Sequence, residues 1–138
     1  MQFHQEREKI LVIDFGSQVT KLIGRNIREL GVYSEIITPK EFLKIKEFKL
    51  IKGIIFSGGP SSVNSKNHQT ISRKIFDKNI PILGICYGLQ LIAKLLGGKI
   101  KSSKSRREFG RALLIKKKIS LLTKNFFKKN TTVWMSHE

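Results

Sequence analysis

The only cysteine of the chain lies where an apolar strand is expected to turn into an apolar helix. Residues 80–83 predict a short buried strand, and the apolar positions of residues 89–96 predict a helix packed on a sheet. Gly84, Cys86 and Gly88 stand between them. Glycines allow close packing around a residue held in a strained conformation, and a helix N-terminus favours a negatively charged sulfur. The pattern predicts a nucleophilic cysteine at a strand-to-helix elbow, in the setting of the serine in G-x-S-x-G sequences.

Short apolar runs alternate with helical patterns over most of the chain. This alternation predicts an α/β fold, with an open and mostly parallel sheet flanked by helices. Strands are expected at residues 10–13, 32–37, 53–57 and 80–83, and helices at 17–30, 41–46, 70–78 and 89–96. Ser17 is expected to cap the first helix. Beyond a basic segment at 99–107, expected to be a hairpin or a mobile stretch, residues 112–115 and 131–135 predict two more strands.

Composition narrows the function classes. The formal net charge is +17, but lysine far outnumbers arginine and the basic residues are scattered over nearly every segment. This pattern indicates solvated lysines rather than an arginine-rich surface that reads bases or phosphates, so no specific nucleic-acid partner is expected. No run approaches the roughly 20 apolar residues of a membrane span. Residues 1–9 form a polar tail without the apolar centre of a signal peptide. With a single cysteine, we expect a cytoplasmic protein.

Three loops should meet at the carboxyl edge of the expected sheet. They are residues 14–18, residues 57–60 and the elbow at Cys86, because sites in open α/β sheets form where parallel strands end. Acyl transfer through a thiolate needs N–H donors directed at the developing oxyanion. The N–H groups of Gly59 and of Tyr87, which follows the cysteine directly, are the best candidates.

Several stretches together resemble a known family. Residues 84–90 with the Ser-Gly-Gly-Pro at 57–60 resemble class I glutamine amidotransferases. Residues 13–18, 28–33, 107–110 and 133–137 are most similar to the N-terminal amidotransferase domains of glutamine-hydrolysing GMP synthases. The resemblance implies a flavodoxin-like sheet and one amidotransferase domain over residues 10–138, incomplete at its C-terminus.

The resemblance also implies roles for individual residues. Cys86 would attack the side-chain amide of glutamine and release ammonia, while Gly59 and Tyr87 form the oxyanion hole. Glutamine itself would be held by Gly58, Gln90, Ser136 and His137. The ammonia would convert XMP to GMP in an ATP-pyrophosphatase (synthetase) domain that uses ATP and magnesium, so this domain needs no cofactor or metal of its own.

The family's triad also contains a His and a Glu that would fall after residue 138, so impaired glutaminase turnover is expected of this chain. His68, in a polar loop, is interpreted as solvated rather than as a replacement base. Three alternatives stay open. One is an amidotransferase for another acceptor, of the anthranilate or carbamoyl phosphate type. The second is a non-catalytic module that binds a synthetase through residues 106–109, and the third is a basic nucleic-acid binder.

Overall fold

The computed structural model describes residues 7–101, 108–115, 117–125 and 130–137. The chain divides into two compact units, residues 1–100 and 101–138. The first contains the parallel sheet and its helices, and the second a β-hairpin. Each unit is described by itself.

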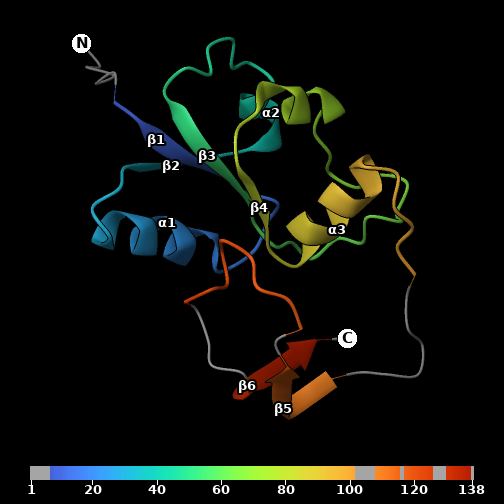
Figure 1. The fold of residues 1–138 in the computed structure, drawn as a ribbon. Helices are drawn as coiled ribbons and strands as arrows, with labels where there is room; N and C mark the ends of the chain where they lie inside the picture. Colours follow the sequence, from blue (N-terminus) through green and yellow to red (C-terminus); the bar gives the residue numbers. More distant parts are fainter. Residues whose placement is uncertain (1–6, 102–107, 116, 126–129, 138) are drawn as a thin grey trace. The chain divides into compact units, whose positions relative to one another are not determined.

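The sheet of the first unit has four parallel strands in the order β2-β1-β3-β4 (Figure 1). The strands span Lys9–Ile13 (β1), Ser34–Ile37 (β2), Ile51–Phe56 (β3) and Ile82–Gly84 (β4). All four expected strands are present, and every end lies within two residues of its predicted position. β1 is an inner strand that pairs with β2 on one side and β3 on the other. Its last residue, Ile13, is in register with Ile37 of β2 and Phe56 of β3. The C-terminal ends of these strands therefore lie at one edge.

Helices cover both faces of this sheet, as expected for an open α/β fold. They are α1 (Thr20–Glu29), the four-residue α2 (Pro39–Phe42), the 3₁₀ helix η1 (Arg73–Lys78) and α3 (Tyr87–Leu95). Alternate residues of β1 point to opposite faces. Leu11 and Ile13 belong to the core cluster, whereas Val12 is in register with Ile36, against which Gly24 of α1 packs.

The core lies between the sheet and the helices α2, η1 and α3. Most of its members come from strands β1 and β3 and from the loops that follow them. The cluster consists of Leu11, Ile13, Phe15, Phe42, Ile51, Ile54, Phe56, Val63, Ile71, Ile75, Tyr87 and Leu91. Phe15 and Tyr87 flank the expected site, so that site is built directly on the hydrophobic core.

Two expected helices begin later than the sequence pattern suggested. The helix predicted from residue 17 starts at Thr20, because Ser17 Oγ accepts the Val19 N–H within the preceding loop instead of capping the helix. The carboxylate of Asp14 accepts the Gly16 N–H and the Thr20 hydroxyl and so stabilises the same loop. The helix expected at 70–78 is a 3₁₀ helix from Arg73, with Ser72 as its cap.

The second unit is an antiparallel hairpin of β5 (Glu108–Ile115) and β6 (Asn130–His137). Both strands expected here are present and longer than predicted. In the basic segment expected at 99–107, residues 102–107 lie outside the described residues.

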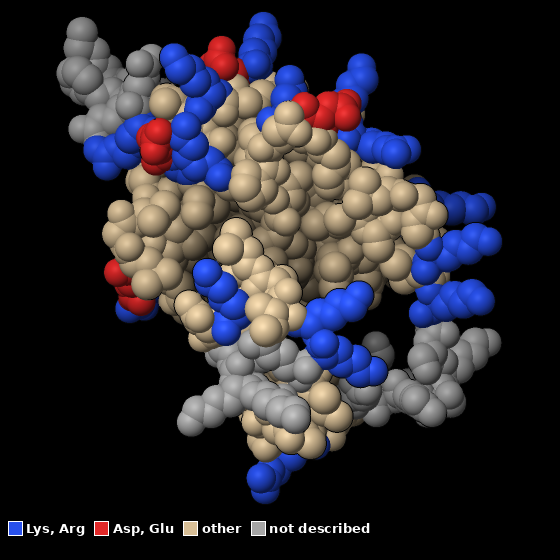
Figure 2. Space-filling view, in the orientation of Figure 1, with Lys and Arg blue, Asp and Glu red and all other residues tan. Residues whose placement is uncertain are grey.

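Figure 2 shows how charged side chains are distributed on one face of the molecule. On the face drawn in Figure 2, the described Lys and Arg side chains stand in several small groups, interrupted by acidic and uncharged residues. In the described part of the chain, none of the helices has the length and apolar character that crossing a membrane requires.

Candidate functional site

The three loops predicted to meet do so at the carboxyl edge of the sheet. Gly58 lies between the other two: a Cβ added there would be 3.6 Å from the Cβ of Cys86 and 3.6 Å from the Cβ and Oγ of Ser17. A Cβ on Gly16 would likewise be 3.2 Å from the Pro60 ring. The ends of β1, β3 and β4 thus form one site around the thiol.

Cys86 has the strained backbone expected of an elbow. Its φ of 51° and ψ of −113° lie in a region that residues with a side chain rarely adopt. The thiol is exposed, and α3 begins at the next residue. Strain of this kind persists only where the surroundings hold it in place, and it is concentrated at functional sites.

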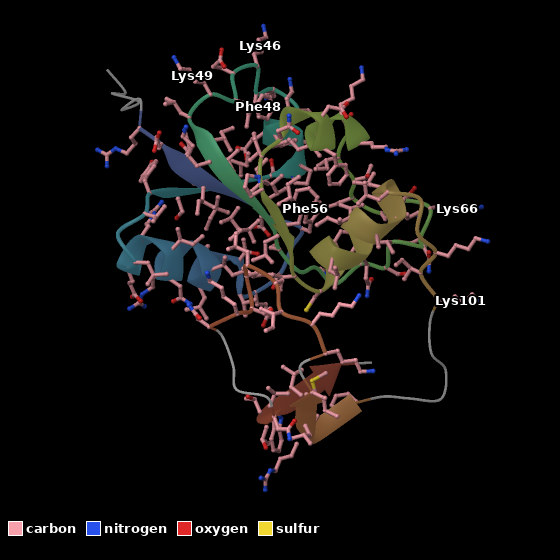
Figure 3. All side chains as sticks on the ribbon, in the orientation of Figure 1. Lys46, Phe48, Lys49, Phe56, Lys66 and Lys101 are labelled. Carbon is pink, nitrogen blue, oxygen red and sulfur yellow. The ribbon has the colours of Figure 1, made fainter. Side chains whose placement is uncertain are left out.

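The two glycines of the elbow allow α3 to pack against the sheet. A Cβ on Gly84 would lie 2.7 Å from the backbone of Leu89, and one on Gly88 would lie 2.2 Å from the carbonyl oxygen of Phe56. Figure 3 shows Phe56 between the sheet and α3. Its carbonyl also accepts the Ile85 N–H at 3.0 Å, so β3 supports the elbow directly.

The two expected oxyanion donors have no competing partner. Among the described residues, neither the Gly59 N–H nor the Tyr87 N–H donates a hydrogen bond to another protein group. Tyr87 is the first residue of α3, where backbone N–H groups have no acceptor within the helix. Within the described residues, both N–H groups thus lack a protein acceptor.

A buried serine that sequence reasoning missed joins two of the loops. Ser57 Oγ accepts the Phe15 N–H at 3.1 Å and donates to the Gly58 carbonyl at 3.0 Å. The residue has no exposed surface, so this hydroxyl satisfies polar groups that water does not reach. The sequence places this serine in the Ser-Gly-Gly-Pro stretch, but it carries no signal for the contact with Phe15, which is 42 residues away.

Tyr87 is anchored through its side chain. Its ring packs on that of Phe15, with the centroids 5.2 Å apart, and its hydroxyl donates to the carbonyl of Gln69. Burial raises the pKa of the Tyr87 hydroxyl above its ordinary value of 10.0. Tyr87, which follows Cys86 directly, is thus held in place by the hydrogen bond of its protonated hydroxyl.

The predicted glutamine-binding residues divide between the two units. Gly58 lies beside Cys86, and Gln90 lies one helical turn after it, where the Gln90 N–H donates to the Cys86 carbonyl at 3.1 Å. Ser136 and His137 lie on β6 of the second unit. His68 shares a hydrogen bond of 2.8 Å between its Nδ1 and the carbonyl of Ser65. This hydrogen bond holds the ring in its own loop, and the solvated role expected of His68 stays a prediction.

Comparisons with known proteins agree with this architecture. The family model described as glutamine amidotransferase class-I matches residues 11–138. The chain is 47% identical over 139 residues to a GMP synthase [glutamine-hydrolyzing] of Macrococcus caseolyticus, and 48% identical over 141 residues to that of Staphylococcus carnosus. Each alignment covers 99% of this chain but 26% of the relative, so the chain spans about a quarter of their length.

Solved structures share the fold. A protein described as one component of a GMP synthase, from Thermoplasma acidophilum, superposes with a TM-score of 0.71 at 29% identity, over 97% of this chain and 66% of that one. A glutamine amidotransferase from Thermotoga maritima gives a TM-score of 0.71 at 19% identity, over 95% of this chain and 60% of that one, and shows the fold alone.

Proposed function

Because the chain belongs to the class I glutamine amidotransferase family, we propose that it is a glutamine-hydrolysing domain with Cys86 as its nucleophile. One observation carries the proposal. The exposed thiol stands on a strained elbow beside the Gly58 turn. The N–H groups of Gly59, on that turn, and of Tyr87, at the start of α3, have no protein acceptor among the described residues. A nucleophile and oxyanion donors are two of the parts that acyl transfer requires.

The proposed reaction has two steps. The Cys86 thiolate attacks the γ-carbonyl carbon of glutamine, and the carbonyl oxygen becomes an oxyanion that accepts the N–H groups of Gly59 and Tyr87. The C–N bond then breaks, the nitrogen takes up a proton and ammonia leaves, which yields a γ-glutamyl thioester. Water attacks the thioester, the C–S bond breaks, and glutamate and the free thiol are formed. Gly58, Gln90, Ser136 and His137 are proposed to hold the glutamine.

Proton transfer in this scheme needs a general base. We propose that the triad histidine and glutamate follow residue 138, as the family resemblance implies. The 138-residue chain would then be acylated on Cys86 but turn over slowly. Loss of triad members costs on the order of 10³- to 10⁶-fold in turnover.

The relatives favour one use for the ammonia. Relatives at 47% and 48% identity are named GMP synthases, which favours XMP as the acceptor over anthranilate- or carbamoyl phosphate-type chemistry. We propose that an ATP-pyrophosphatase domain is the partner, that it binds ATP and magnesium, and that both act in the cytoplasm. The described residues contain no group of three or more His, Cys, Asp and Glu arranged to hold a metal ion.

A glutamine-mimicking electrophile tests the proposed site. A chloroketone analogue of glutamine should modify the chain once, on Cys86, and an excess of glutamine should protect it, as mass spectrometry of the intact chain would show. Cys86 is the only cysteine, so Cys86→Ser is a matched control without a thiol. Modification that glutamine does not slow would contradict a glutamine pocket. Glutaminase turnover at ordinary enzyme rates by this chain would instead contradict the proposed position of the base.

A further inference from the structure

Phe15, the second residue after β1, contacts both loops that carry the proposed oxyanion donors. Its carbonyl lies against Gly59, where an added Cβ would be 2.4 Å from the Phe15 oxygen. Its ring packs on Tyr87 at 5.2 Å and on Phe56 at 5.8 Å between centroids. Phe15 is 2% exposed. One buried residue thus touches Gly59 through its backbone and Tyr87 through its side chain.

The backbone of Phe15 is itself fixed. Its N–H donates to the buried Ser57 hydroxyl, which in turn donates to the Gly58 carbonyl. Phe15 is therefore attached to the Gly58-Gly59 turn by a hydrogen-bond relay and to α3 by ring packing. Both attachments lie in a close-packed interior, where positions change little without a cost.

We propose that Phe15 is a positioning residue that sets the separation between the Gly59 and Tyr87 N–H groups, and so forms the oxyanion hole before substrate arrives. The role rests on the proposed function, since it presupposes acyl transfer at Cys86. Oxyanion donors act over about 2.7–3.1 Å, and a displacement of roughly 1 Å can cost about 100-fold in rate. Phe15 does not touch the reacting atoms and acts through the two donor residues.

Two reactions of the same thiol separate positioning from general structure. Acylation by the γ-p-nitrophenyl ester of glutamate passes through an oxyanion: the C–S bond forms, the ester C–O bond breaks, and p-nitrophenolate leaves without needing an acid. Alkylation by iodoacetamide displaces iodide and forms no oxyanion. Both require the thiolate, so the ratio of their rates cancels any change in its population. This ratio reports on the oxyanion hole.

The decisive variant is Phe15→Leu, which keeps an apolar side chain but removes the ring from Tyr87. We expect the acylation rate to fall about 10- to 100-fold while the alkylation rate stays within about threefold of the original. Phe42→Leu is the matched control, because Phe42 is a buried core ring on α2 that packs on Phe48. It should leave the ratio unchanged.

Two further variants keep the test decisive if Phe15→Leu does not fold. Phe15→Met fills the site with a flexible side chain of similar volume, and Ser57→Ala removes the acceptor of the Phe15 N–H. Both should lower acylation selectively, with circular dichroism confirming the fold.

Each remaining outcome counts against a specific claim. Equal losses in both rates, or a selective loss in Phe42→Leu as well, would overturn the positioning role. Unchanged acylation in folded Phe15→Leu or Phe15→Met would also overturn it and leave the proposed function standing. If the unsubstituted chain is alkylated on Cys86 but never acylated, the proposed function fails and this role fails with it.

Discussion

The carbonyl oxygen of Phe56 and the α-carbon of Gly88 are in such close contact that a Cβ on Gly88 would lie 2.2 Å from that oxygen. This contact fixes the first turn of α3 on the end of β3. It therefore determines how far Cys86 stands from the turn that follows β3. Gly88 is not among the residues with positive φ, so its backbone conformation does not require a glycine. A glycine is needed there because a side chain would have no space.

Gly88→Ala should displace the start of α3. The added methyl would force backbone to move, and overpacking of this kind costs about 1–3 kcal/mol or more. We expect a lower free energy of unfolding by urea and slower labelling of Cys86 by the glutamine analogue. Gly53→Ala is the control, because a Cβ there makes only ordinary contacts, 3.6 Å from Ile10. Equal stability of the two variants would show that α3 tolerates the shift.

The backbone strain at Cys86 should be measurable as stability. Glycine adopts positive φ without the steric cost that any side chain incurs. Cys86→Gly should therefore unfold at a higher urea concentration than Cys86→Ala, with a free energy of unfolding that is larger by roughly 1 kcal/mol. Both variants lack the thiol, so the comparison isolates the backbone. If Cys86→Ala is the more stable variant, the elbow carries no strain of this kind.

Tyr87 should make stability depend on alkaline pH. Because burial raises its pKa above 10.0, the unfolded chain loses the phenolic proton first. The stabilisation is complete below pH 10 and is lost as the pH rises from there through the folded-state pKa. We expect Tyr87→Phe to be less stable by about 1 kcal/mol at pH 8, where the hydrogen bond to Gln69 is intact. Urea unfolding of both proteins from pH 8 to 11 should show this difference shrinking above pH 10; a constant difference would contradict the burial of the hydroxyl.

Glu41 should make the stability of the fold depend on pH in the acidic range. Hydrogen bonds from the Thr38 N–H and hydroxyl, at 2.7 and 2.9 Å, are the main reason that the Glu41 pKa is lowered from 4.5. The carboxylate thus stabilises the fold above pH 4.5, and this effect is lost as the pH falls through the lower folded-state pKa. Glu41→Gln should have a shallower loss of stability between pH 5 and 3. An acid unfolding curve parallel to that of the original chain would contradict the capping box at α2.

The strands and the elbow could be predicted because their signals are local. Runs such as residues 10–13 have no polar interruption, and a cysteine between two glycines after such a run has few other uses. Parallel pairing then places the loops after β1, β3 and β4 at one edge, whichever residues they contain. The meeting of Cys86, Gly58 and Ser17 follows from topology.

The start of the first helix could not be predicted from propensity. Ser17 is a good capping residue, but its hydroxyl serves the Val19 N–H, and the Asp14 carboxylate binds Gly16 and Thr20. Side chains that can accept from several nearby N–H groups make alternative loop structures nearly equal in energy. Competition among such groups decides where a helix begins.

The contacts that support the site could not be predicted from the sequence either. Nothing local indicates that the Ser57 hydroxyl joins two loops, since Phe15 is 42 residues away. The same holds for the ring of Phe15 against Tyr87, which depends on how β1 and α3 are packed. The roles of Ser136 and His137 stay predictions, to be tested by the effect of their substitution on glutamine protection.

The central place of β1 has a consequence for synthesis on the ribosome. This strand is made before the other three of its sheet, its partner β3 ends at Phe56, and the elbow comes after β4. A nascent chain can therefore form the middle of its sheet before Cys86 has been translated. The order of synthesis thus supplies the support, the Phe56 carbonyl at the end of β3, before the elbow that packs on it.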